Sequence, residues 1–292
     1  METAKEAWGE RAADRFGIMF PPQTQNEHLL FNDEKYLAVE NDNVVYCVNA
    51  HEKTVVDNHS QVQELAKEHL RKEYRNKYPV INSICQMDMM PVSRKFGLER
   101  GRAIDRYYIE HFIENNSDLI RGNCIEIAEN TYTLRYGGNR VKNADVLHVE
   151  GWGDNVIKGN LETGEGIPKE KYDCAIITQT LMFIFDIKQA AENIYGMLNA
   201  GGNALITVSG ISQVSRYDAD LWGSYYSFYE DALYKLFIPL FGKENVKIEI
   251  YGNVKTACAM LCGLCQEDLK EEDFKTVDRE YPVIISAVLT KK

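Results

Sequence analysis

Residues 123–138 read NCIEIAENTYTLRYGG, a short apolar run followed by a loop without an apolar period. The run, CIEI at residues 124–127, predicts a β-strand. A strand that passes directly into such a loop is typical of the carboxyl edge of a parallel α/β sheet, where ligands bind. Glu126 interrupts the run, and a buried carboxylate is costly unless it is paired. We therefore expect Glu126 either to cap a neighbouring backbone amide or to order a ligand-binding loop.

Strand and helix patterns alternate around this stretch. The run DCAIIT at residues 173–178 is almost wholly apolar, as expected of a strand covered on both faces. Ala200-Gly201-Gly202 predicts a turn before a later strand. Strands are predicted at 124–127, 146–149, 155–161, 173–178, 204–208, 246–251 and 283–289, and helices at 104–113, 187–198 and 230–241. The alternation predicts an α/β, Rossmann-like doubly wound fold, with a mostly parallel sheet of about seven strands and helices on both faces.

The N-terminal region has a different pattern and lacks a core of its own size. A helix is predicted at residues 3–16, a hairpin from the apolar runs 36–39 and 44–48, and a second helix at 59–74. We expect residues 1–90 to form an α+β extension of helix, hairpin and helix that packs on, or lids, a main domain at residues 91–292.

Composition excludes several classes of function. The chain has 292 residues, 45% of them hydrophobic, which is enough for a sizeable core. Its net charge of −11 makes it a poor candidate for binding nucleic acid or an anionic membrane surface. No apolar run is long enough to span a bilayer, and the charged N-terminus lacks the apolar core of a signal peptide. A cytoplasmic location is the resulting expectation.

The cysteines predict neither disulfides nor a metal site. There are seven, an odd number, and most lie in apolar strands or helices. Cys262 and Cys265 have C-x-x-C spacing, but a zinc site needs a second ligand pair, and a redox pair belongs at the start of a βαβ unit. We expect these cysteines, with Cys258, to be small buried helix residues.

Five segments occur in a characteristic order. They are CIEI at 124–127, DVLHVE at 145–150, VIKGNL at 156–161, YDCAIITQTLMFI at 172–184 and LNAGGNALITVSG at 198–210. In this order, residues 123–292 resemble the class I S-adenosylmethionine-dependent methyltransferase family. The last two segments are the most specific, because a polar residue follows the fourth strand and an L-x-x-G-G turn precedes the fifth. The resemblance implies a methyltransferase-like main domain with S-adenosylmethionine as cofactor.

Three further segments resemble one branch of that family, which is often linked to bacterial surface-glycan synthesis. They read PVSRKFGLERGRAIDRYYIEHF at 91–112, ENTYTLRYGG at 129–138 and GISQVSRYDADLWGSYYSF at 210–228. The branch implies a methyltransferase acting on a sugar or sugar-phosphate intermediate of surface-glycan synthesis.

The loop after the first strand departs from the family pattern. Residues 128–132 read AENTY where the family has G-x-G-x-G, and Gly137 and Gly138 come only later. Glycines let a backbone approach a ligand closely and adopt positive φ. The altered loop supports an alternative function, a non-catalytic methyltransferase-like domain that binds a ligand or a glycan enzyme such as a glycosyltransferase. A second alternative is an enzyme of the same fold that modifies nucleotide sugars with another cofactor.

The resemblance implies cofactor contacts at the ends of the first four strands. Glu126 would order the loop or touch the methionine part, and Glu150 would accept hydrogen bonds from the ribose hydroxyls. Asn160 would pair with the adenine amino group. The alternatives are a solvated loop acid for Glu150 and a turn residue for Asn160. The cofactor-binding candidates are Glu126, Ala128, Asn130, Thr131, Glu150, Asn160, Leu161, which would pack on the adenine ring, and Gln179.

A methyl acceptor also needs catalytic and binding groups. Gln179 would sit at the rim facing the transferred methyl group, or else cap the following helix. A hydroxyl acceptor requires a base, and the catalytic candidates besides Gln179 are His148, Asp218 and Asp220. His148 lies within a strand and is alternatively a core histidine. Arginines bind phosphate or carboxylate groups and aromatic rings stack on sugars. The substrate-binding candidates are Arg94, Arg100, Arg106, Tyr107, Arg216, Trp222 and Tyr225. Their alternatives are surface ion pairs, an aromatic lid packed on the core, or contacts that tie the extension to the main domain.

Overall fold

The computed structural model describes residues 88–292 except Trp152 and Asp154, the strands within residues 27–56, and Arg71 and Arg75. The chain divides into two compact units, residues 1–88 with 99–101, and residues 89–98 with 102–292. The helix predicted at 3–16 lies outside the described residues, as does that at 59–74 apart from Arg71 and Arg75. The domain boundary near residue 90 stays a prediction.

The first unit contains a four-stranded antiparallel sheet with the order β1-β2-β3-β4. The strands are β1 (Glu27–Asn32), β2 (Tyr36–Asn41), β3 (Val44–Asn49) and β4 (Val55–Val56). β2 and β3 pair in register from Tyr36 opposite Asn49 to Asn41 opposite Val44, so the predicted hairpin is confirmed.

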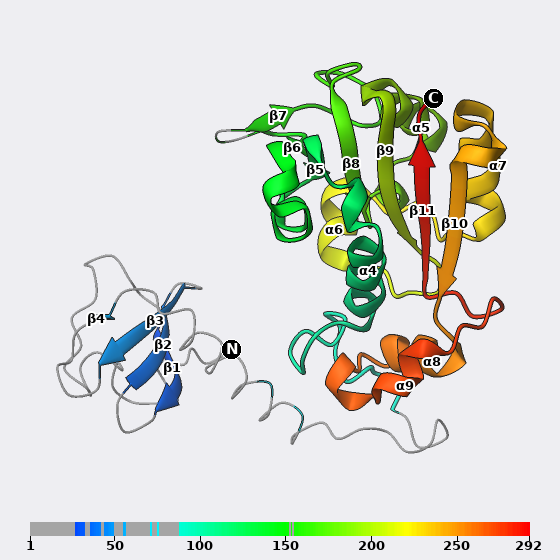
Figure 1. The fold of residues 1–292 in the computed structure, drawn as a ribbon. Helices are drawn as coiled ribbons and strands as arrows, with labels where there is room; N and C mark the ends of the chain where they lie inside the picture. The colour runs from blue at the N-terminus through cyan, green and yellow to red at the C-terminus, as the bar shows by residue number, and fades with distance from the viewer. Residues whose placement is uncertain are drawn as a thin grey trace. The chain divides into compact units, whose positions relative to one another are not determined.

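The second unit is built on a seven-stranded sheet with the order β10-β11-β9-β8-β5-β6-β7 (Figure 1). Pairing is parallel from β9 through β8, β5 and β6 to β7, and β11 is antiparallel to both β9 and β10. The strands are β5 (Gly122–Ile127), β6 (Val141–His148), β7 (Val156–Lys158), β8 (Tyr172–Thr178), β9 (Leu198–Ser209), β10 (Val246–Tyr251) and β11 (Ile284–Thr290). The predicted doubly wound, mostly parallel sheet is confirmed, and its strand order reverses between β5 and β8.

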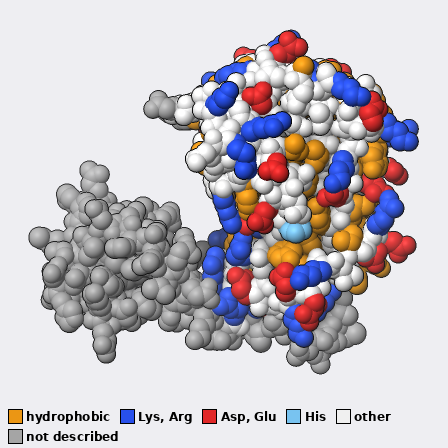
Figure 2. All heavy atoms as spheres, viewed as in Figure 1, with side chains coloured by type: hydrophobic (Ala, Val, Ile, Leu, Met, Phe, Trp, Pro, Cys, Tyr) orange, Lys and Arg blue, Asp and Glu red, His pale blue; other side chains and the backbone are white. Residues whose placement is uncertain are grey.

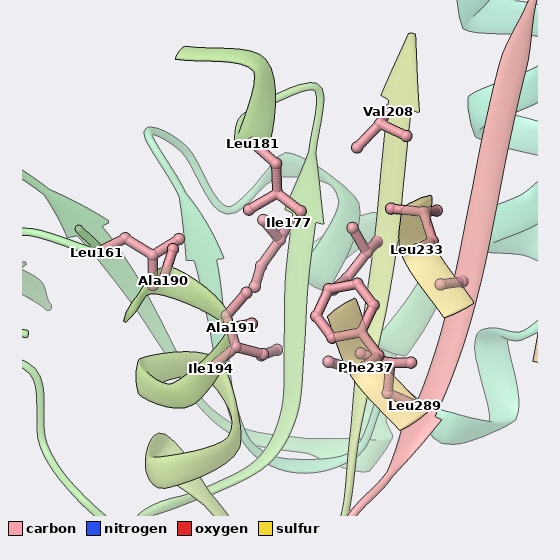
Figure 3. Packing of buried hydrophobic residues seen from close by; sticks show 14 of the residues in the cluster. Leu161, Ile177, Leu181, Ala190, Ala191, Ile194, Val208, Leu233, Phe237 and Leu289 are labelled. Atoms are coloured by element: carbon pink, nitrogen blue, oxygen red, sulfur yellow. The ribbon is translucent and has the colours of Figure 1, made fainter. Parts of the chain in front are cut away.

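Two hydrophobic cores cover the two faces of this sheet. β8 contributes to both, since Ala175 and Ile177 belong to one cluster and Cys174 and Ile176 to the other. The first core includes residues of α5 (Ile187–Met197) and α7 (Glu230–Phe241), and Figure 3 shows their side chains meeting those of the strands. The second includes residues of α4 (Ile104–Asn115), α8 (Val254–Leu261) and α9 (Glu271–Lys275). The prediction that DCAIIT is covered on both faces is therefore correct.

The residues Ala200-Gly201-Gly202, predicted to form a turn before a later strand, lie within the limits of β9, but Gly201 has a φ of +79° and is not extended. The register between β8 and β9 shifts between Tyr172 and Cys174, which accommodates the extra residues of β9. The Gly201 N–H donates to the Lys291 carbonyl at 2.7 Å, and the Lys291 N–H donates to Gly202 at 2.9 Å. Pairing with the end of the chain therefore holds this glycine-rich bulge in place at the start of β9.

The cysteine expectation is only partly correct. Cys265 is buried, whereas Cys258 on α8 is exposed and Cys262, half-buried, follows the end of that helix. Among the described residues, no three His, Cys, Asp or Glu side chains are grouped so that they could hold a metal ion.

The surface of the second unit mixes charges of both signs. On the face in Figure 2, Lys and Arg side chains are interspersed with Asp and Glu side chains. In the part of the chain that the structure describes, no helix combines the length and apolar character needed to cross a bilayer.

Candidate functional site

A cavity of about 1470 Å³ lies at the carboxyl edge of the parallel strands. Its wall includes residues that follow or end four strands: Ala128 after β5, His148 at the end of β6, Gln179 after β8 and Ser209 at the end of β9. All the lining residues belong to the second unit. This edge, at the reversal of strand order between β5 and β8, is where open α/β sheets bind ligands. The volume exceeds the roughly 300–1,000 Å³ of a pocket for one small ligand.

Glu126 organises the loop after β5 by accepting hydrogen bonds from it. Its side chain is only 2% exposed. Oε2 accepts hydrogen bonds from the Thr133 N–H and Oγ1, both at 2.8 Å, and Oε1 accepts from the Tyr132 N–H at 3.2 Å. Burial raises the pKa of Glu126, while the hydrogen bonds from Thr133 and Tyr132 oppose that rise. Glu126 thus both caps backbone amides and orders the loop, and it does not line the cavity.

Ala128 adopts the backbone conformation that a glycine would normally supply in this loop. Its φ is +67°, in the left-handed region that glycine normally occupies. The Ala128 N–H donates to the Leu147 carbonyl at 3.0 Å, which joins the loop to β6, and Ala128 lines the cavity. The backbone therefore takes the glycine-type conformation with a methyl side chain.

The next two candidates of the loop do not line the cavity. Asn130 Nδ2 donates to the Ala144 carbonyl at 3.2 Å, and Thr131 Oγ1 donates to Glu129 Oε2 at 2.9 Å. Both side chains stabilise the loop, and their direct contact with a cofactor stays a prediction.

The end of β6 differs from the expectation for Glu150. β6 ends at His148, and the chain turns at Gly151, whose φ is +61°. Glu150 is consequently exposed and lies outside the cavity wall, as the alternative of a solvated loop acid describes. His148 lines the cavity and is not a core histidine; its Nδ1 accepts hydrogen bonds from the N–H groups of Glu150 at 3.1 Å and Gly151 at 3.5 Å.

Asn160 and Leu161 both line the cavity. Asn160 Oδ1 accepts hydrogen bonds from the N–H groups of Glu162 at 2.8 Å and Thr163 at 3.3 Å, so the side chain stabilises a turn, as its alternative predicts. The oxygen needed to accept from an adenine amino group is thus already engaged, which leaves Nδ2 as a donor for a ligand. Leu161 belongs to the first core and presents an apolar surface to the cavity.

Gln179 is held in a defined position at the end of β8. Its φ is +50°, and its N–H donates to the Thr207 carbonyl at 2.8 Å. Nε2 donates to Thr207 Oγ1 at 3.3 Å, and Oε1 accepts from Ser209 Oγ at 2.5 Å. Gln179 therefore lines the cavity while bridging to β9, and it does not cap the following 3₁₀ turn.

Two segments outside the sheet bring polar and aromatic residues to the cavity wall. Residues 91–98 contribute Arg94, and α6 (Arg216–Trp222) contributes Arg216, Asp218 and Trp222. Gln213 Nε2 donates to the Arg94 carbonyl at 2.8 Å, which joins the two segments.

The remaining candidates of that stretch lie off the cavity wall. Asp220 forms an ion pair with Arg216 and does not line the cavity. The Tyr225 ring packs edge-on against Phe185, with ring centroids 5.3 Å apart. The neighbouring Tyr226 lines the cavity in its place, with its hydroxyl donating to the Phe185 carbonyl at 2.7 Å.

Neither Arg100 nor Tyr107 lines the cavity. Arg100 is buried, and its carbonyl accepts a hydrogen bond from Arg75 within the first unit. The Tyr107 ring stacks on Phe274 at 4.2 Å, and its hydroxyl donates to Glu271 at 2.7 Å. Tyr107 therefore holds α9 against α4. Arg106, one position earlier on the helix, does line the cavity, and its NH1 donates to the Tyr132 hydroxyl at 3.0 Å.

Asp105 is one of the cavity residues that the sequence reasoning missed. It lies in the first turn of α4, is 9% exposed, and lines the cavity. Its Oδ1 has no hydrogen-bond partner among the described residues. Burial raises the pKa of Asp105, and the charge of Arg106 partly offsets that rise. The available signal was a carboxylate within the buried helix face formed by Ile104, Tyr108 and Ile109, analogous to Glu126 within its apolar strand.

Comparisons with known proteins give likenesses of structure only. No protein-family profile and no curated protein matches the chain in sequence. A SAM-dependent methyltransferase from Archaeoglobus fulgidus matches with 11% identity and a TM-score of 0.42, over 64% of this chain and 94% of that one. One from Mesorhizobium loti matches with 10% identity and a TM-score of 0.41, over 65% and 98%. The N-methyltransferase NodS from Bradyrhizobium japonicum, in complex with S-adenosylhomocysteine, matches with 12% identity and a TM-score of 0.39, over 65% and 89%. The fold assignment rests on the strand order and pairing of the sheet itself.

Proposed function

We propose that the chain is an S-adenosylmethionine-dependent methyltransferase. The main support is the cavity, which lies at the reversal of strand order and is walled by the ends of β5, β6, β8 and β9. Its volume of about 1470 Å³ leaves space for a methyl acceptor beside a nucleoside cofactor.

The residues along the cavity fit such a cofactor. Asn160 would donate from Nδ2 to an adenine ring nitrogen, and Leu161 would pack on the ring. Ala128 would bring the loop backbone to the methionine part, because its left-handed φ reproduces the conformation of a glycine. When bound, the cofactor supplies a methyl group carried on a sulfonium ion. The protein then contributes alignment and the exclusion of water.

The acceptor in this proposal is a sugar or sugar phosphate of surface-glycan synthesis. Arg94, Lys95 and Arg216 line the cavity in a chain whose net charge is −11, and these cations suit an anionic acceptor group. Trp222 and Tyr226 offer aromatic faces for a sugar ring. The surface-glycan context comes from the sequence resemblance of residues 91–112, 129–138 and 210–228.

Asp218 is the favoured proton acceptor for a hydroxyl substrate. It lines the cavity, whereas Asp220 does not. His148 Nδ1 accepts two backbone N–H groups, so in the neutral ring the proton resides on Nε2, which is then a donor. His148 is therefore suited to orient an acceptor oxygen and not to remove its proton.

The alternative is a non-catalytic domain that binds a ligand or a glycan enzyme. The observations that favour it are the loop without glycines and the position of Glu150 outside the cavity wall.

A transfer assay separates the two functions. The full chain is incubated with methyl-labelled S-adenosylmethionine and a panel of sugars, sugar phosphates and nucleotide sugars. Label transfer that depends on Asp218 and Arg216 supports the enzyme. Cofactor binding without transfer to any member of the panel supports the alternative.

A further inference from the structure

An acid and a base that lie next to each other on α4 both line the cavity without an ion-pair partner. Asp105 is 9% exposed, and its Oδ1 accepts no hydrogen bond from any described residue. Arg106 donates to the Tyr132 hydroxyl at 3.0 Å and forms no salt bridge within the described part of the chain. The cavity therefore presents one negative and one positive group, neither of them in an ion pair with a described residue, whose charges compensate each other only in part.

The charge of Arg106 offsets only part of the cost of burying Asp105, because consecutive side chains of a helix do not face one another and the two form no ion pair. A carboxylate that is nine-tenths buried without a cationic partner is expensive, and native structures rarely keep such a group without a reason. A ligand that carries both a cationic N–H donor, for Asp105, and an anionic acceptor, for Arg106, would satisfy the pair.

The position of the pair indicates which part of a ligand it meets. Arg106 is hydrogen-bonded to Tyr132, whose N–H is held by Glu126 in the loop after β5. Ala128 and Glu129 of that loop line the same cavity. Asp105 and Arg106 therefore lie on the β5 side of the cavity, next to the loop that lacks its glycines.

We propose that Asp105 and Arg106 bind the zwitterionic α-amino acid end of the cofactor. Asp105 accepts hydrogen bonds from the ammonium group, and Arg106 donates to the carboxylate. The pair supplies from α4 charged side-chain contacts that add to those of the loop backbone at Ala128. This assignment rests on the proposed function, and it concerns the binding of the cofactor and not the transfer step.

The test compares two ligands that differ only at this end. S-adenosylhomocysteine carries the amino acid group, and methylthioadenosine has the same nucleoside thioether without it. Calorimetry is performed with the full chain, with Asp105→Asn, and with Glu114→Gln. The last is a matched loss of charge on the same helix at an exposed position away from the cavity.

We expect Asp105→Asn to weaken the binding of S-adenosylhomocysteine by about tenfold to a hundredfold, which is the usual effect of losing a hydrogen bond between charged groups. Binding of methylthioadenosine should change less than about twofold. Glu114→Gln should bind both ligands as the wild type does. Equal weakening of both ligands by Asp105→Asn, or no weakening of either, overturns the assignment.

A second comparison tests which ligand group each of the two side chains binds, and it does not depend on one variant folding well. The wild type should lose affinity for S-adenosylhomocysteine analogues that lack either the amino or the carboxylate group. Arg106→Gln should weaken binding of the analogue that keeps only the carboxylate and leave binding of the amine-only analogue unchanged. Asp105→Asn should weaken binding of the amine-only analogue and leave binding of the carboxylate-only analogue unchanged. Wild-type affinity that is indifferent to both groups overturns the assignment even if a variant does not fold. If neither S-adenosylhomocysteine nor methylthioadenosine binds the folded wild type, the cofactor proposal itself fails, and the two failures are thereby distinguished.

Discussion

Replacing Glu126 with alanine removes the acceptor of three hydrogen bonds in one step. The Thr133 N–H, the Thr133 hydroxyl and the Tyr132 N–H would all lose their partner in a site where the carboxylate is 2% exposed. Each hydrogen bond to a charged group is worth about 1.5–3 kcal/mol, but the cost of burying the carboxylate offsets part of the sum. We expect a loss of about 3–5 kcal/mol in the free energy of unfolding, which is a large fraction of a typical domain's stability.

The assay combines urea unfolding with hydrogen exchange at the Tyr132 and Thr133 amides. Glu129→Ala is the matched control, because it removes an exposed acid three residues away in the same loop and should cost less than about 1 kcal/mol. In Glu126→Ala the two amides should exchange much faster than in the wild type and the control. A variant that unfolds within about 0.5 kcal/mol of the wild type, or whose two amides stay protected, would refute the role of Glu126.

Four further outcomes follow from the geometry of the cavity and of the loop after β5. Ala128→Gly should keep cofactor affinity and raise stability by up to about 1 kcal/mol, because it relieves a Cβ at positive φ; a thermal melt that shows clear destabilisation contradicts this. Since burial raises the pKa of Asp105, the ratio of S-adenosylhomocysteine to methylthioadenosine affinity should fall as pH drops through that raised pKa. Titration over the pH range in which the protein stays folded should show this fall in the wild type and not in Asp105→Asn. The ratio cancels shared effects of the other charged groups on the cavity wall, which include Arg94, Lys95, Arg106, Glu129 and His148. A raised pKa also makes the unliganded fold more stable below the ordinary aspartate pKa and less stable above the raised one, so Asp105→Asn should melt at a higher temperature than the wild type at neutral pH. Trp222→Ala should leave S-adenosylhomocysteine affinity intact while methyl transfer falls, whereas Tyr225→Ala, which lies off the cavity wall, should leave transfer close to wild type; equal losses in both variants would reject the acceptor wall.

Much of the fold could be predicted because periodicity reports which faces are buried. The limits of α7 and β10 agree with the predicted 230–241 and 246–251, and the apolar run of β8 is covered on both faces. The start of β9 could not be placed, since the bulge at Ala200-Gly201-Gly202 is hydrogen-bonded to Lys291, which is distant in the sequence. Local composition carries no information about such a partner.

The site could be predicted less fully than the fold. The sequence located the strand ends, and Ala128, His148, Asn160 and Gln179 all reach the cavity. It could not tell which of two adjacent residues faces inward. Arg106 lines the cavity while Tyr107 packs on Phe274, because neighbours on a helix point about 100° apart.

Glu150 and Asp105 depart from the sequence-based expectations for separate reasons. Glu150 lies outside the cavity wall, since β6 ends at His148 and the chain turns at Gly151, and its contact with a ribose stays a prediction. Asp105 was missed although the helix pattern places this carboxylate on the same buried face as Ile104, Tyr108 and Ile109.

The measurement that tests the central claim most directly is calorimetric titration of the folded full chain with S-adenosylhomocysteine. Val149→Trp serves as the comparison, because Val149 is an exposed residue of the cavity wall and an indole there would fill the space for the nucleoside. The account predicts a single site on the wild type, with an affinity in the range of about 1 μM to 1 mM that enzymes commonly show for substrates, and a loss of at least about tenfold in the variant. No binding of either S-adenosylhomocysteine or S-adenosylmethionine to the wild type, or equal binding to wild type and variant, would contradict it.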